Sequence, residues 1–93
     1  MIRTFGDQQS ESVFRRDRVK GIPHDDQRSA SRKLLILDAA EALDDLRVPP
    51  GNRLEKLKGD RKGEYSIRVN DQWRICFVWS DGAAYDIEIT DYH

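Results

Sequence analysis

Cysteine, histidine and long apolar runs are all scarce in this chain of 93 residues. Cys76 is the one cysteine, so an intrachain disulfide is excluded and a small buried side chain is expected there. His24 and His93 are too widely spaced to form a metal site with it, and His24 is expected to be a surface or capping residue. No stretch resembles a secretory signal or a membrane span of about 20 apolar residues. We therefore expect no metal site and a reducing, cytoplasmic setting.

An excess of charge of one sign is also missing, because the net charge is −1. That value by itself argues against nucleic-acid binding, but the charges are unevenly distributed. Residues 53–74 hold seven Lys and Arg against four Asp and Glu, whereas residues 75–93 hold four acidic residues and no Lys or Arg. We expect one cationic region on an acidic body, which would attract phosphates locally. An ordinary solvated surface is the alternative.

Two helices are predicted in the first half of the chain. The first spans about 7–19, with Asp7 or Ser10 as its N-cap. The second spans about 26–46, and its expected apolar stripe recurs at helical spacing at Ile36, Ala39, Leu43 and Leu46. The Pro49-Pro50 pair prevents the second helix from continuing.

Alternation of apolar and polar residues predicts strands at both ends of the chain. A short strand is expected at 1–5, and three further strands are expected at 65–69, 73–79 and 85–89. Turn residues separate these three strands, so they should form an antiparallel meander. Helices that precede such a meander must cover its apolar face. The predicted fold is an α+β two-layer sandwich in one domain, residues 1–93.

Arg74 is the first candidate for chemistry. It interrupts a predicted strand rich in large apolar residues and lies on the face opposite Trp73 and Ile75. An arginine held by strand geometry can bind a phosphate through two parallel hydrogen bonds. Lys58 and Arg68 could reach the same side. The alternative is an ordinary polar residue on the solvent face of the sheet.

The chain ends on Asp91-Tyr92-His93, which is the second candidate. RNA cleavage by attack of a 2′-hydroxyl needs a base, an acid and cations for the developing charge. Histidine is the side chain type that titrates near neutrality, while Tyr92 can donate a hydrogen bond or stack and Asp91 can orient an imidazole or an RNA hydroxyl. A frayed chain end without a role is the alternative.

Together these motifs resemble the HigB-type (host inhibition of growth) toxins of the RelE/ParE superfamily, from bacterial type II toxin–antitoxin systems. The similarity spans nearly the whole chain, including Phe5 and the Leu-Asp-Ala-Ala run at 37–40. Its order and spacing are specific although each motif alone is weak. The strings that carry it are Pro49-Pro50-Gly51-Asn52-Arg53-Leu54, Leu57-Lys58-Gly59-Asp60-Arg61-Lys62-Gly63, Tyr65-Ser66-Ile67-Arg68-Val69-Asn70, Gln72-Trp73-Arg74-Ile75 and Asp91-Tyr92-His93.

The resemblance implies a microbial RNase-like fold with one N-terminal strand, two helices and an antiparallel sheet. It also implies a ribosome-dependent mRNA endonuclease that inhibits translation and growth and uses neither a metal nor another cofactor. The implied partners are a HigA-type antitoxin with a helix-turn-helix domain, the ribosome with its message, and operator DNA reached through the antitoxin.

Site residues follow from the same resemblance. The implied catalytic set is Lys58, Arg74, Asp91, Tyr92, His93 and Glu55, and the implied RNA- or ribosome-binding set is Arg53, Lys56, Arg61, Lys62 and Arg68. Many family members carry a histidine where this chain has Glu55. Either Glu55 replaces the imidazole as a base, or the toxin is mild and works partly through binding.

Two other classes of function stay open at this point. One is a toxin without catalysis that inhibits ribosome function, ribosome biogenesis or DNA gyrase by binding. The other is a solitary, non-toxic domain that binds RNA or protein.

Overall fold

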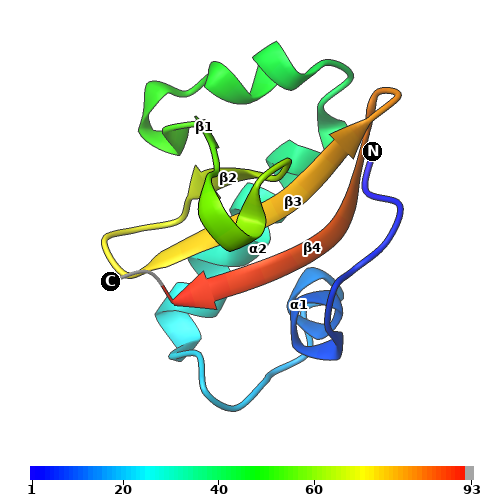
Figure 1. Ribbon diagram of the computed structural model, residues 1–93. Coiled ribbons are helices and arrows are strands. Elements are labelled where there is room, and N and C mark those ends of the chain that lie inside the picture. Colours follow the sequence, from blue (N-terminus) through cyan, green and yellow to red (C-terminus); the bar gives the residue numbers. More distant parts are fainter. Residues whose placement is uncertain (92–93) are drawn as a thin grey trace.

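The computed structural model describes residues 1–91 and contains two α-helices and a four-stranded antiparallel sheet (Figure 1). The helices are α1 (Gln8–Phe14) and α2 (His24–Ala39), and the strands are β1 (Glu55–Lys56), β2 (Tyr65–Arg68), β3 (Trp73–Ser80) and β4 (Ala83–Asp91) in sheet order 1-2-3-4. Short 3-10 turns are η1 (Leu43–Arg47), η2 (Pro50–Asn52) and η3 (Gly59–Arg61). The predicted α+β class is confirmed. Within residues 1–91, no helix combines the length and apolar character that crossing a bilayer requires.

Helix α1 begins where the sequence predicts and ends earlier. The Asp7 carboxylate accepts a hydrogen bond from the Ser10 amide at 2.7 Å, which makes Asp7 the N-cap. The helix stops at Phe14 rather than at about residue 19 because Arg16 adopts the left-handed conformation, with φ of 66°. The predicted C-terminal end is therefore wrong by about one and a half turns.

Helix α2 also ends early, at Ala39 instead of 46. Its continuation is replaced by η1, because the Asp45 carboxylate accepts the amides of Glu41 and Ala42 at 2.9 and 3.0 Å and caps a new turn. These two hydrogen bonds lower the pKa of Asp45.

The buried stripe of α2 differs from the predicted one. Ile36 is only half-buried and Ala39 is exposed, while Leu46 is fully buried from its place in η1. The face that packs on the sheet is instead Gln27, Ala30, Leu34 and Leu37.

The predicted strand at 1–5 is present only as two isolated parallel bridges, which join Ile2 to Ala84 and Phe5 to Ile87 of β4. Between these two bridges, β4 contains a β-bulge that interrupts its ladder with β3, and Asp86 in this bulge has a positive φ of 55°. The Asp86 amide donates to the Thr4 hydroxyl at 2.9 Å instead of to a backbone carbonyl.

The two hairpins form where turn residues predict them. Asp81 and Gly82 both have positive φ, 51° and 76°, between the paired Ser80 and Ala83, which is the type I′ geometry that matches strand twist. In the other hairpin, the Asn70 side chain accepts the amides of Gln72 and Trp73 at 2.9 Å each.

Trp73, Ile75 and Phe77 are buried on the sheet face that packs against the helices. Helix α2 lies behind the sheet in Figure 1, while η3 lies in front of β3. The first turn of α2 is tied to the β2–β3 hairpin, because the Asp26 carboxylate accepts from Trp73 Nε1 at 3.0 Å and from Asn70 Nδ2 at 2.8 Å. Helix α2 therefore covers one face of the sheet, and η3 lies over the other face.

Candidate functional site

The sheet face turned away from α2, here called the outer sheet face, gathers four of the candidate residues: Glu55, Arg61, Arg68 and Arg74. Residues directly opposite one another on neighbouring strands project to the same side. One such row runs Glu55, Ser66, Cys76 and Glu88, and the next runs Arg68, Arg74 and Thr90. Side chains from all four strands therefore meet on one surface.

Arg74 is buried at the centre of this face, with 5% of its surface exposed. Its Nε donates to the Ser66 hydroxyl at 2.8 Å, and its Nη2 donates to the carbonyl of Arg53 at 2.9 Å. A buried cation needs such partners to offset lost hydration. The structure therefore rules out the alternative of an ordinary polar residue on the solvent face, because the Arg74 guanidinium is held inside the sheet.

Glu55 approaches this guanidinium from β1. Its Oε2 lies 3.8 Å from Arg74 Nη2, and its side chain is 49% exposed. A phosphate that binds Arg74 must therefore compete with a carboxylate at the same position. Among the described residues, the cation that pairs with Glu55 is therefore Arg74.

The carbonyl of Arg53 reaches Arg74 because the chain before it is anchored. Buried Asn52 donates to the carbonyls of Leu46 and Val48 and accepts from Lys33 Nζ at 2.6 Å. Burial lowers the pKa of Lys33, and the nearby Arg68 and Arg32 lower it further. Arg53 itself is in the left-handed region, with φ of 44°.

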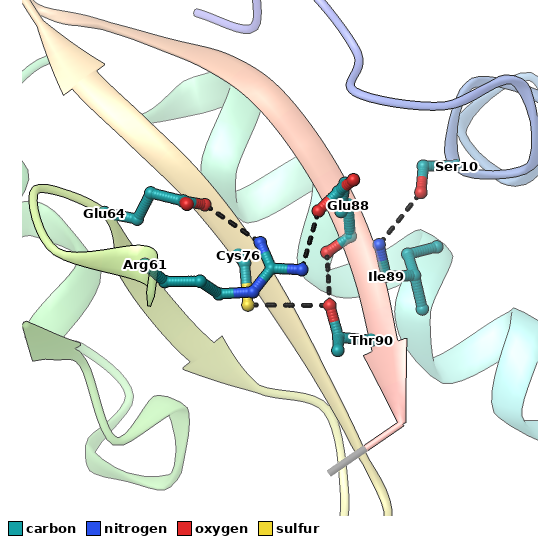
Figure 2. A network of polar contacts seen from close by, with 7 residues as sticks. All are labelled: Ser10, Arg61, Glu64, Cys76, Glu88, Ile89 and Thr90. Carbon is teal, nitrogen blue, oxygen red and sulfur yellow. Dashed lines mark hydrogen bonds and ion pairs between the residues drawn. The ribbon is translucent and has the colours of Figure 1, made fainter. Parts of the chain in front are cut away.

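Arg61 lies across the outer sheet face above Cys76, between two carboxylates (Figure 2). Its guanidinium is 3.1 Å from Glu64 Oε1 and 2.8 Å from Glu88 Oε2. The hydrogen bond with Glu88 raises the pKa of Arg61, with the charges of both carboxylates adding to it. Arg61 therefore pins the loop between β1 and β2, which carries Lys58, to strand β4. The sequence analysis missed Glu64 and Glu88, which contribute this clamp.

The other predicted residues are more open. Arg68 is half-buried and pairs with Asp71, and Lys58 is exposed at the N-cap of η3. Asp91 is exposed at the end of β4, and its Oδ2 accepts from Gln72 Nε2 at 3.3 Å. Because Asp91 pairs with Trp73, it projects to the helix side of the sheet and not to the side of Arg74. Tyr92 and His93 lie outside the described residues. The remaining predicted RNA-binding side chains are all exposed: Arg53, Lys56 and Lys62.

The structure thus brings together Arg74, Glu55 and Ser66, and it places Arg61 beside Glu88 on the same face. Ser66 was missed as a partner of Arg74, although its period-two spacing from Arg68 was visible in the sequence. Within residues 1–91, no group of three or more His, Cys, Asp and Glu side chains is arranged to hold a metal ion.

The backbone places the chain among RelE-like folds. It superposes on a chain of the YoeB–YefM toxin–antitoxin heterotetramer from Staphylococcus aureus with a TM-score of 0.61 and 20% identity, over 100% of this chain and 98% of that one. A second YoeB–YefM complex from the same organism gives 0.56 and 18% over the same shares. Identities this low show the shared fold alone.

Sequence comparison identifies the family. The model for the RelE-like toxin of the type II toxin–antitoxin system HigB matches residues 3–93. Toxin HigB-1 of Vibrio cholerae serotype O1 is 49% identical over 85 residues, which is 90% of each chain. Endoribonuclease HigB of Proteus vulgaris is 33% identical over 93 residues, which is 100% of each. The chain therefore belongs to the HigB-like toxin family of type II toxin–antitoxin systems, as its motifs predict, and an antitoxin is its partner.

Proposed function

We propose that this toxin is a ribosome-dependent mRNA endonuclease, and that the outer sheet face is where the message is cut. The single observation that carries the proposal is the buried Arg74 guanidinium, held by Ser66 and by the carbonyl of Arg53. A cation fixed before the reaction stabilises developing phosphate charge without reorganisation. The Proteus vulgaris relative, named an endoribonuclease, supports the same assignment.

In the proposed reaction, the 2′-oxygen of one nucleotide forms a bond to the adjacent phosphorus while the bond from phosphorus to the 5′-oxygen breaks. A base removes the 2′-hydroxyl proton, and an acid protonates the leaving 5′-oxygen. Arg74 stabilises the negative charge that grows on the non-bridging oxygens. The products are a 2′,3′-cyclic phosphate and a 5′-hydroxyl end.

Proton transfer is assigned to Lys58 and His93, with Asp91 and Tyr92 orienting the RNA. Glu55 is displaced from Arg74 when the scissile phosphate binds, because two anions cannot share one guanidinium without mutual repulsion. The exposed cations Arg53, Lys56 and Lys62, together with Arg68, contact the RNA backbone, and Arg61 acts by holding the Lys58 loop to β4.

The proposed setting follows from the substrate. A translating ribosome is met in the cytoplasm, and the antitoxin is proposed to be of the HigA type, with operator DNA contacted through it. No metal or other cofactor is needed, because lysine, arginine and histidine side chains supply both the charge and the protons.

Inhibition by binding alone is the second candidate, and one observation favours it. Glu55 forms an ion pair with Arg74, and Glu64 and Glu88 form ion pairs with Arg61. The positive charge of the outer sheet face is therefore partly neutralised before RNA binds. A toxin of this kind would still dock on ribosomes or DNA gyrase through its exposed lysines.

Mapping of message 5′ ends after toxin induction distinguishes the two candidates. Wild-type toxin should give cuts clustered at codon positions, and Arg74→Ala should reduce them by about 10²–10³-fold, as expected for removal of a transition-state donor. Arg47→Ala is the matched control, since Arg47 is an exposed arginine paired with Asp44 in η1. Both variants must still bind the antitoxin, which shows that they fold. Growth arrest by wild-type toxin without message cuts would overturn the nuclease proposal.

A further inference from the structure

A second cationic feature lies on the helical side of the molecule. A cavity of about 330 Å³ opens between the end of α1, the loop that follows it and the first turns of α2. Four arginines line it, and we name them together the arginine pocket: Arg16, Arg18, Arg28 and Arg32. Its other polar lining residues are Asp17, His24, Gln27 and Ser31. Its lining residues belong to α1, α2 and the loop between them, and α2 lies behind the sheet while η3 lies in front of it (Figure 1).

The arginines of this pocket are exposed, and within residues 1–91 the structure records no ion pair between them and a carboxylate. Arginines elsewhere do pair, as Arg15 does with Glu11 and Arg47 with Asp44. Arg32 donates to the neutral Ser29 hydroxyl, at 3.3 Å. The pocket therefore carries a local positive excess on a chain of net charge −1.

The sequence analysis overlooked this excess because the second predicted helix is acidic in composition. Three of its carboxylates make internal hydrogen bonds: Asp26 accepts from Trp73 and Asn70, Asp38 accepts the Ile2 amide at 2.8 Å, and Asp45 caps η1. On the open surface of α2, Arg28 and Arg32 are exposed, as is Asp25 in the first turn.

The loop that supplies half of the pocket is held rigidly. Gln27 of α2 is buried, its Nε2 donates to the carbonyls of Val19 and Ile22 at 3.0 and 2.8 Å, and its Oε1 accepts the Val19 amide at 3.2 Å. Gln9 of α1 holds the same loop through the carbonyl of Lys20 at 2.8 Å. Arg16 and Arg18 therefore extend from a fixed backbone, which lowers the entropy cost of binding a ligand.

We propose that the arginine pocket binds an RNA phosphodiester, as a second RNA contact on the helical side of the molecule. Guanidinium groups match phosphate oxygens in paired hydrogen bonds, and the pocket lies at the N-terminal end of α2, where the helix dipole also favours an anion. An acidic peptide is disfavoured, because protein interfaces rely on apolar anchors at their centre and the one aliphatic lining residue, Val13, is 1% exposed. The biological setting of this contact rests on the proposed function.

The test uses fluorescence anisotropy with labelled 2′-O-methyl RNA, which cannot be cleaved. The Arg28→Ala/Arg32→Ala double variant should bind more weakly, and the slope of log K against log salt should shrink by about 0.7 for each lost contact with single-stranded RNA. The Arg3→Ala/Arg47→Ala pair removes the same charge from two exposed arginines outside the pocket and should leave both quantities unchanged. Arg16→Ala/Arg18→Ala provides an independent pocket variant, and thermal melts confirm folding.

Two probes distinguish the source of the phosphodiester. A larger loss on a ribosomal RNA hairpin identifies ribosomal RNA, and a larger loss on an unstructured strand identifies the message. Equal losses in the pocket and control pairs would show diffuse charge attraction and overturn the proposal. A pocket variant that loses binding to poly-glutamate but keeps binding to RNA would assign the surface to an acidic protein partner instead. Because uncleavable RNA is used, a failed cleavage assay leaves this result standing.

Discussion

Replacing Glu55 by glutamine distinguishes its two possible roles by the sign of the change in activity. The Glu55 carboxylate lies 3.8 Å from the Arg74 guanidinium, and the two side chains are 49% and 7% exposed. If Glu55 only competes with the substrate phosphate, Glu55→Gln removes an obstacle. If Glu55 is the general base, the variant removes the group that accepts the 2′-hydroxyl proton.

The geometry sets the size of each outcome. Two unit charges about 4 Å apart interact by about 1 kcal/mol in water and about 4 kcal/mol at an effective dielectric constant of 20. The half-exposed Glu55 belongs near the lower figure, since solvent screens it. Loss of about 1 kcal/mol of competition raises kcat/KM about fivefold, whereas loss of a general base lowers it by about 10²–10⁴-fold.

The assay measures kcat/KM for a defined message on purified ribosomes. We expect Glu55→Gln to be as active as the wild type or up to about fivefold more active. Asp44→Asn is the matched control, because Asp44 is an exposed carboxylate paired with Arg47 in η1, outside the site. A fall of a hundredfold or more in Glu55→Gln alone would refute the competition model and make Glu55 catalytic.

Three further predictions concern the framework of the site. Arg61→Ala should lower stability by about 1 kcal/mol, since it removes two partly exposed ion pairs, and a double-mutant cycle with Glu88→Ala followed by thermal melting measures their coupling. Asp45→Asn should destabilise the chain at pH 7 but not in acid. A lowered carboxyl pKa contributes stability above the unfolded value of about 3.9 and loses it as pH falls through the lower folded value, so urea melts of the two proteins should converge as the pH falls below the folded pKa. Ser10→Ala should cost about 1–3 kcal/mol in urea unfolding, because buried Ser10 Oγ accepts the Ile89 amide at 2.9 Å, and Ser10→Thr should restore part of the loss if the hydroxyl is what matters.

Short-range signals predicted the parts of the fold that depend on adjacent residues. The Asp7 cap and the Asp81-Gly82 turn each need only a local side chain or a positive φ, and both form as expected. The end of α2 was mispredicted because Asp45 competes for the amides of Glu41 and Ala42. That competition can be recognised only once the break after Ala39 is known.

The site was predicted in outline but not in its contacts. Arg74 was identified from its strand position, yet its partners come from positions 8 and 21 residues away in sequence, at Ser66 and Arg53. The clamp of Arg61 on Glu88 joins a loop to the last strand. Sheet register decides such pairs, and register depends on the whole set of packed strands rather than on any one segment.

The bulge at Asp86 also affects how the toxin behaves beside copies of itself. An exposed edge strand is a template on which another chain can extend a sheet. One edge strand is β4, whose outer side pairs with the first five residues through two bridges. The other edge strand is β1, which has only two residues, the exposed Glu55 and Lys56. Neither side offers a long, flat, uncharged run, so toxin released from its antitoxin should stay dispersed rather than polymerise edge to edge.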